Sequence, residues 1–133
     1  MTEHAEIELE RHFDPVMLPA SATVMMAARH MHSRRVSAVL VTEGDADLIG
    51  IFTERDAISR VLADGRDPAE TTLAEVMTDN PEFVTPQKSA MEVVQLMQAL
   101  NCRHLPIVSE GKAVGIVSRG KLRGLASNGV SAD

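Results

Sequence analysis

The sequence predicts an α+β fold in which one unit of helices and short strands occurs twice. The stretch Gly-Ile-Phe-Thr-Glu-Arg-Asp at residues 50–56 returns in altered form as Gly-Ile-Val-Ser-Arg-Gly-Lys at residues 115–121, an offset of 65 (115 − 50 = 65). Upstream, the segment around Pro19 aligns with the segment around Pro86 at an offset of 67 (86 − 19 = 67). Neither copy holds enough apolar surface to fold alone, so we expect the two copies to pack sheet to sheet as a pseudo-two-fold pair.

The first copy predicts an extended segment, a helix, two strands and a closing helix. The extended segment ends at Pro19, and the core face of the helix has apolar residues at helical spacing, at Val24, Ala27, Ala28 and Met31. A turn at Gly44 separates two β-prone runs. The strands and the closing helix are predicted at residues 37–41, 48–52 and 54–63.

The second copy repeats this order. Its extended segment ends near Pro86, and the predicted core face of its helix is Ala90, Val94 and Met97, with Val93 as a further candidate. Its strands and closing helix are predicted at residues 105–108, 113–117 and 119–126, with a turn at Gly111. A polar segment at 64–72 and a short helix at 73–78 join the copies. The boundaries are an acidic extension at 1–13, repeats at 14–63 and 79–126, a linker with its lead-in helix at 64–78, and a tail at 127–133.

Composition and charge exclude several classes of protein. The chain has 133 residues, 44% of them hydrophobic, and no apolar run long enough to cross a membrane. The net charge of −6, the absence of Trp and Tyr and the presence of only three Phe oppose nucleic-acid binding. The acidic N-terminus has no signal-peptide pattern, and Cys102 is the one cysteine, so we expect a reducing compartment, the cytoplasm.

Motifs for catalysis and metal binding are absent from the sequence. There is no Gly-x-Ser-x-Gly elbow and no phosphate-binding Gly-x-x-x-x-Gly-Lys loop, so we expect no enzyme. His30 and His32 are two residues apart on a predicted helix and face different directions, so we expect no metal site. Of the eight methionines, those on the long helices suit either the core or a dimer surface.

The repeated stretch supports two interpretations. Thr53 and Asp56 have the spacing of a capping box, in which a hydroxyl and an acid satisfy backbone N–H groups at a helix start. The same geometry suits a nucleotide, since free N–H groups attract phosphate and a carboxylate can accept hydrogen bonds from two sugar hydroxyls. In the second copy Ser118 keeps the hydroxyl but Lys121 replaces the acid. A lysine only donates hydrogen bonds, and its charge is unfavourable at the positive end of a helix.

The repeated features together resemble a tandem pair of cystathionine-β-synthase (CBS) domains, also called a Bateman module. The matching features are the proline-led helix start, the strand Arg-His-Leu-Pro-Ile-Val at 103–108, and the Gly-apolar-apolar-Thr/Ser-x-x-Asp stretch, all repeated in order. The resemblance covers residues 14 to 126. It implies two β-α-β-β-α units, with clefts between the repeats that in this family hold AMP, ADP, ATP or S-adenosylmethionine.

The resemblance also implies which residues contact such a ligand. Thr53 would approach the phosphate and Asp56 the ribose hydroxyls, while in the second site Ser118 matches and Lys121 points to a lost site or a more anionic ligand. The implied base-facing positions are Val36, Ser37 and Ala38 in one copy and Arg103, His104 and Leu105 in the other. Leu18 with Pro19, and Thr85 with Pro86, flank the helix starts.

Arginines at the two helix-to-strand turns have alternative roles. Arg103 and His104 suit either a phosphate contact or an ordinary surface turn, and the two readings stay open. For Arg34 and Arg35 we favour a simple interaction with the helix dipole.

The function that follows is regulatory. We expect a stand-alone module that needs no cofactor, binds an adenosine-type effector and signals through a homodimer. The alternative is a ligand-free interaction module that associates with an enzyme or transporter. Neither a nucleic acid nor a membrane is expected as a partner.

Overall fold

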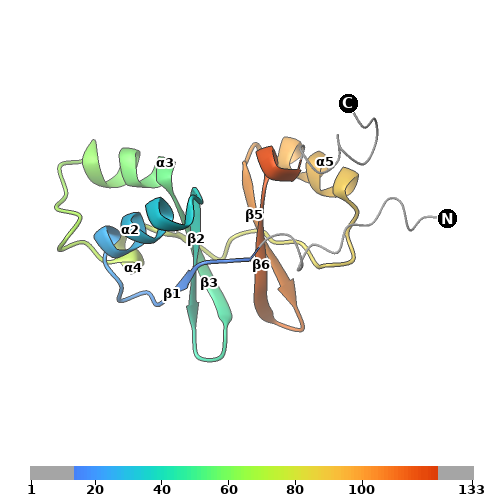
Figure 1. Cartoon of the computed structure of the whole chain (residues 1–133), viewed down its shortest axis with the longest axis horizontal. Coiled ribbons are helices and arrows are strands. Elements are labelled where there is room, and N and C mark those ends of the chain that lie inside the picture. The colour runs from blue at the N-terminus through green and yellow to red at the C-terminus, as the bar shows by residue number, and fades with distance from the viewer. Residues whose placement is uncertain (1–13, 123–133) are drawn as a thin grey trace. The chain divides into compact units, whose positions relative to one another are not determined.

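The computed structural model describes residues 14–122 of the chain. These residues form two compact units, each built around one copy of the repeat (Figure 1). Residues 15–81 with 111–113 form the N-terminal unit, and residues 14, 82–110 and 114–122 form the C-terminal unit. Both units combine helices with strands, in agreement with the α+β prediction. No helix within the described residues is long and apolar enough to cross a bilayer.

A small sheet and four helical segments form the N-terminal unit. The strands of this sheet are β1 (Met17–Leu18), β2 (Ala38–Glu43), β3 (Asp47–Thr53) and β4 (Thr78–Asp79). Lys112, at the start of β6 (Lys112–Ser118), also pairs with Asp47 of β3. β1 is parallel to β2, while the pairs β2–β3 and β3–β4 are antiparallel. Helices α2 (Val24–Arg34) and α3 (Glu54–Asp56), the latter continuing as the π-helix η1 (Ala57–Leu62), cover one face of the sheet (Figure 1). The fourth segment is α4 (Leu73–Val76).

Local chemistry fixes the ends of α2. The Thr23 hydroxyl accepts a hydrogen bond from the Met26 N–H at 3.2 Å, and Arg35 ends the helix in a left-handed conformation. Its inner face buries Val24, Ala27 and Met31. These side chains belong to one core with residues of the sheet and the other helices, among them Val39, Val41, Phe52, Val61 and Leu73. The predicted core position Ala28 is only partly buried.

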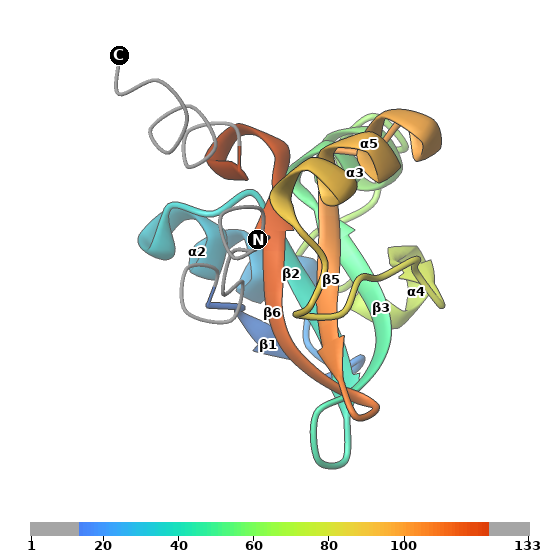
Figure 2. The same cartoon turned by 90° about the vertical axis from the view of Figure 1, so that its right-hand side faces the viewer.

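Three elements and a terminal helical turn form the C-terminal unit. They are α5 (Ala90–Leu100), β5 (His104–Ser109) and β6 (Lys112–Ser118) from residue 114 onward, followed by a helical turn at residues 119–122. β5 and β6 are hydrogen-bonded neighbours, drawn as a long hairpin in Figure 2. Glu110 and Gly111 link them, and both have positive φ, as in the tightest hairpin turns.

The long helices and the strands after them are related by an offset of 66 residues, so our alignment of these segments at 67 was wrong. The hairpins' second strands and the closing turns keep the offset of 65. The caps of the two long helices are Thr23 and Ser89, and their inner faces, Val24, Ala27 and Met31 against Ala90, Val93 and Met97, follow the same spacing. The turns before them also match, since Ala22 N donates to Pro19 O and Lys88 N to Thr85 O. Pro19 and Pro86 therefore occupy neighbouring, not equivalent, positions of one turn. This is why Val93 is buried and Val94 only partly buried.

Most predicted elements are confirmed, with ends that differ by one or two residues. The helix predicted at 73–78 ends at Val76, and Thr78 pairs with Ile51 in β4 instead. The methionines on the long helices differ in burial. Met97 is buried, whereas Met26 and Met91 are 45% and 64% exposed. Part of the predicted helix at 119–126, the extension at 1–13 and the tail at 127–133 lie outside the described residues.

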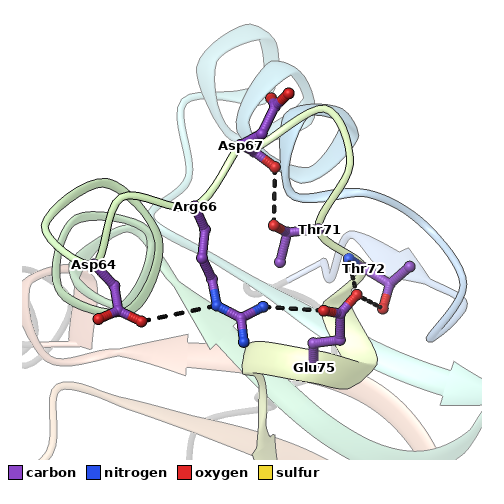
Figure 3. A network of polar contacts seen from close by, with 6 residues as sticks. All are labelled: Asp64, Arg66, Asp67, Thr71, Thr72 and Glu75. Carbon is purple, nitrogen blue, oxygen red and sulfur yellow. Dashed lines mark hydrogen bonds and ion pairs between the residues drawn. The ribbon is translucent and has the colours of Figure 1, made fainter.

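The linker is anchored to the N-terminal unit by hydrogen bonds, and polar contacts within the linker and α4 are drawn in Figure 3. Val24 N donates to Thr71 O at 2.9 Å and Met25 N to Pro68 O at 3.0 Å, so the linker covers the start of α2. Arg66 lies between Asp64 and Glu75, with its NH1 3.0 Å from Glu75 Oε1. The segment predicted as a polar connection is thus part of this unit's structure.

A glycine at the centre of β3 allows close packing against the chain after α4. A Cβ on Gly50 would meet Met77 Sδ and lie 3.1 Å from Thr78 O. We therefore expect Gly50→Ala to lower the free energy of unfolding by about 1–3 kcal/mol, the usual cost of overpacking, in urea denaturation. Gly120→Ala is the control, since nothing lies within 4 Å of that Cβ and alanine favours a helix. Equal destabilisation by both variants would contradict this role of Gly50.

The capping box of α5 makes stability depend on pH. Ser89 N donates to Glu92 Oε1 at 2.9 Å, and this bond holds the pKa of the Glu92 carboxyl below its usual range. A carboxyl with a lowered folded pKa contributes its stability above about pH 4.3, the unfolded value, and loses it as pH falls through the folded pKa. We expect Glu92→Gln to flatten the fall in melting temperature below that pH. If the melting temperature of Glu92→Gln fell with decreasing pH as steeply as that of the parent, Glu92 would not be the source of this pH dependence.

Candidate functional site

The turn from β3 into α3 has the geometry that its sequence predicted. Thr53 N donates to Asp56 Oδ2 at 3.0 Å, and Asp56 N donates to the Thr53 hydroxyl at 3.1 Å. Thr53 has an extended backbone, and the helix begins at Glu54. Both bonds of the predicted capping box are therefore present.

The start of β2 lies beside this turn. Ala38 is paired with Thr53 across the two strands, and Glu54 N donates to Ser37 O at 2.9 Å. Val36 precedes them, partly buried, where its N–H closes the end of α2 on Met31 O. The structure thus brings five predicted ligand-binding residues together at one end of the N-terminal sheet: Val36, Ser37, Ala38, Thr53 and Asp56.

Two further predicted residues lie elsewhere on the same sheet. Leu18 is paired with Val41 in β2, three residues along the strand from Ala38, and its side chain is buried. Pro19 follows it and is exposed. At about 3.3 Å per residue, Leu18 is roughly 10 Å along the strand from the Thr53 turn, so pairing within this sheet does not bring it to that turn.

The Asp56 carboxylate also faces a cation that the sequence reasoning missed. Arg60 Nε lies 3.7 Å from Asp56 Oδ1, and the side chains are 46% and 17% exposed respectively. Arg60 NH1 in turn donates to Val76 O at 2.9 Å. The spacing of four residues on a helix could have revealed the ion pair. Nothing local in the sequence marks the bond to Val76, sixteen residues away.

The second turn has a different chemistry. The Ser118 hydroxyl accepts a hydrogen bond from Lys121 N at 3.3 Å, but Lys121 supplies no carboxylate, so only half of the capping box forms. Arg119 N donates to Arg103 O at 2.8 Å, and Arg119 NH2 donates to Cys102 O at 3.0 Å. The turn therefore joins three cationic residues, of which Arg119 was not predicted.

The remaining predicted residues of the C-terminal unit are spread along its elements. His104 begins β5 and is partly buried, Leu105 is buried, and Thr85 is exposed in the turn before α5. At the corrected offset of 66, Ser37 corresponds to Arg103 and Ala38 to His104. Cys102 packs against the core of this unit, and burial raises the pKa of its thiol.

Within the described part of the chain, no three His, Cys, Asp or Glu side chains could hold a metal ion together. His30 and His32 are both exposed on α2. Arg34 in the last turn of α2 and Arg35 at its cap are also exposed, as expected for cations at the negative end of a helix.

The repeated unit corresponds to a known domain. A family model described as the CBS domain matches the chain twice, over residues 7–63 and 73–127. The chain belongs to the CBS domain family. Its two copies are a tandem CBS pair, as the resemblance predicted.

Relatives carry the same domain in other proteins. CBS domain-containing protein CBSCBSPB3 of Arabidopsis thaliana is 42% identical over 100 residues, which are 75% of this chain and 18% of that protein. A protein with CBS domains from Burkholderia ambifaria MC40-6 has a similar structure, with a TM-score of 0.78 and 33% identity over 92% of this chain and 85% of that one. The chain thus spans about a fifth of the length of the plant relatives, with 18% for CBSCBSPB3. The names of these relatives indicate no catalytic family.

A more distant neighbour shows the same fold. The CBS domain pair of protein MJ0100 has a TM-score of 0.80 at 21% identity, covering 92% of this chain and 98% of that one. Its structure contains 5′-methylthioadenosine and S-adenosyl-L-methionine.

Removing the cap hydroxyl tests the structural role of the first turn. We expect Thr53→Ala to lower the free energy of unfolding by about 1 kcal/mol, because Asp56 N then loses its acceptor at the helix start. Ser118→Ala is the matched control in the second turn, where the bond is longer and exposed, and should cost less. Chemical denaturation measures both, and a larger loss for Ser118→Ala would overturn the ranking.

Proposed function

We propose that this CBS pair is a regulatory module that binds an adenine nucleotide or a related adenosyl compound at the Thr53–Asp56 turn. The observation that carries the proposal is that a partly exposed carboxylate, a hydroxyl and the start of β2 meet there in one CBS repeat. The family membership supports a binding role, and the chemistry of the turn supports a ligand with sugar hydroxyls.

The capping box leaves Asp56 able to accept further hydrogen bonds. An ionised carboxylate has about four lone-pair sites on its two oxygens. The box uses one of them on Oδ2, and Arg60 faces Oδ1 at 3.7 Å, beyond the distance of a good hydrogen bond. A diol can therefore donate to this group while Thr53 N keeps its acceptor. The helix cap and the ligand contact are compatible roles for the same side chain.

The ligand class receives support from outside the chain only at the level of the fold. The MJ0100 pair binds two adenosyl compounds, but at 21% sequence identity its similarity to this chain shows only a shared fold. The choice of an adenosine-type effector therefore depends on Thr53 and Asp56. The second turn, with Lys121 in place of the acid, is the weaker candidate for such a ligand.

The alternative function is a ligand-free module that regulates an enzyme or transporter by contact. Exposed apolar side chains on α2 and η1 support this role, since Met26, Ile58 and Leu62 are 45%, 59% and 62% exposed. The same side chains suit the homodimer that we propose for the ligand-binding form. Under either function we propose that the module itself is not an enzyme, and that its compartment is the cytoplasm, because a single cysteine suits a reducing environment.

A thermal-shift panel of AMP, ADP, ATP and S-adenosylmethionine distinguishes the two functions. A ligand that binds only the folded state at a hundred times its Kd adds about 2.7 kcal/mol. We therefore expect one adenosyl compound to raise the melting temperature of the parent by several degrees. Asp56→Ala should abolish that shift, measured against the variant's own ligand-free value.

Lys121→Ala is the matched control, because it changes the equivalent position of the second turn. It should keep the shift. A shift that survives Asp56→Ala would refute binding at the first turn. The absence of any shift with all four compounds would favour the ligand-free alternative.

A further inference from the structure

Two arginines after the first turn hold the short helix α4 in place. Arg60 NH1 donates to Val76 O, at the last residue of α4, at 2.9 Å. Arg66 NH1 donates to Glu75 Oε1 at 3.0 Å (Figure 3). A helix of four residues cannot persist by its own hydrogen bonds, and its last carbonyls have no partners within the helix. Arg60 supplies a partner to one of these carbonyls.

Arg60 also contacts the proposed ligand site. Its Nε lies 3.7 Å from Asp56 Oδ1, so one guanidinium group faces the carboxylate with one nitrogen and α4 with another. Arg66 provides a contrast, because its guanidinium group pairs with Glu75 and Asp64 and not with Asp56. Of the two arginines that hold α4, Arg60 is the one in contact with the first turn.

The chain after α4 leads to the second repeat. Met77 N donates to Leu73 O at 2.8 Å, and the next residues, Thr78 and Asp79, form β4 against β3. A change in the hydrogen bond between Arg60 and Val76 O thus affects the segment that connects the N-terminal unit to the rest of the chain.

We propose that Arg60 is a positioning residue that couples the Asp56 carboxylate to α4. When no ligand is bound, the negative charge of Asp56 holds the Arg60 guanidinium group where its NH1 reaches Val76 O. A ligand whose hydroxyls donate to Asp56 weakens the attraction between its carboxylate and the Arg60 guanidinium group, and thereby loosens the end of α4. The ligand step depends on the proposed function, whereas the coupling between Asp56 and α4 exists without a ligand.

A ligand-free experiment tests the coupling by amide hydrogen exchange in NMR. The readout is the exchange rate of the Met77 amide, relative to that of Ala27, whose N–H donates to Thr23 O in α2. Asp56→Asn keeps an oxygen for the capping box but removes the charge that faces Arg60. Because an i,i+4 ion pair changes an equilibrium constant about twofold, we expect Asp56→Asn to raise the relative rate about twofold. Arg60→Gln should raise it at least as much.

Double variants separate coupling from general loosening. Asp56→Asn should add nothing when Arg60→Gln is already present, because the carboxylate then has no guanidinium group to hold. With Arg66→Gln, which also weakens the hold on α4, the effect of Asp56→Asn should persist in full. An unchanged Met77 rate in Asp56→Asn, or the same increase in the Arg60→Gln background, would overturn the proposal.

The ligand step is tested with AMP as the probe. AMP should raise the relative Met77 rate in the parent and leave it unchanged in Arg60→Gln. If AMP stabilises the fold without affecting Met77 in the parent, the relay is refuted while the proposed function stands. If none of the four adenosyl compounds binds but the double variants behave as expected, the proposed function fails and the coupling is supported.

Discussion

Backbone N–H groups at the start of a helix need acceptors, and meeting this need organises both copies of the repeat. Hydroxyl side chains do so at Thr23, Thr53, Ser89 and Ser118, each at the point where an extended segment becomes a helix. These caps fix where each helix begins, and thereby which side chains face the core. At Thr53 the cap also positions the acid that is proposed to contact a ligand, so the structural and functional roles share the same atoms.

Sequence reasoning succeeded where the relevant interactions are local. The capping box at Thr53 and Asp56 spans three residues, and the strands follow from short β-prone runs between turns. The error in the repeat offset arose because Pro19 and Pro86 were taken as equivalent. A turn before a helix accepts proline at more than one position, whereas helix caps and a buried face leave one register.

The two residues that were missed, Arg60 and Arg119, each make a contact with a distant segment. Arg60 reaches Val76 only because α4 returns to the closing helix, and Arg119 contributes because its backbone meets Arg103. Spacing alone predicts neither contact. The two turns nevertheless share a backbone design, with an N–H of the closing helix bonded to a carbonyl just before a central strand. Their side chains differ in charge, so the repeat conserves geometry while the chemistry of its two copies differs.

The anchoring of the linker bears on how this chain can be divided. The family match for the first repeat ends at residue 63, yet Thr71 O and Pro68 O accept hydrogen bonds from the first two residues of α2, and Leu73 is fully buried in the same core. Ending a fragment at residue 63 would remove these acceptors and expose that core. A fragment that keeps β1 to β4 and the helices packed on them ends no earlier than Asp79, where β4 completes its pairing with β3. In this protein the segment matched by the family model therefore ends before the compact unit of structure does.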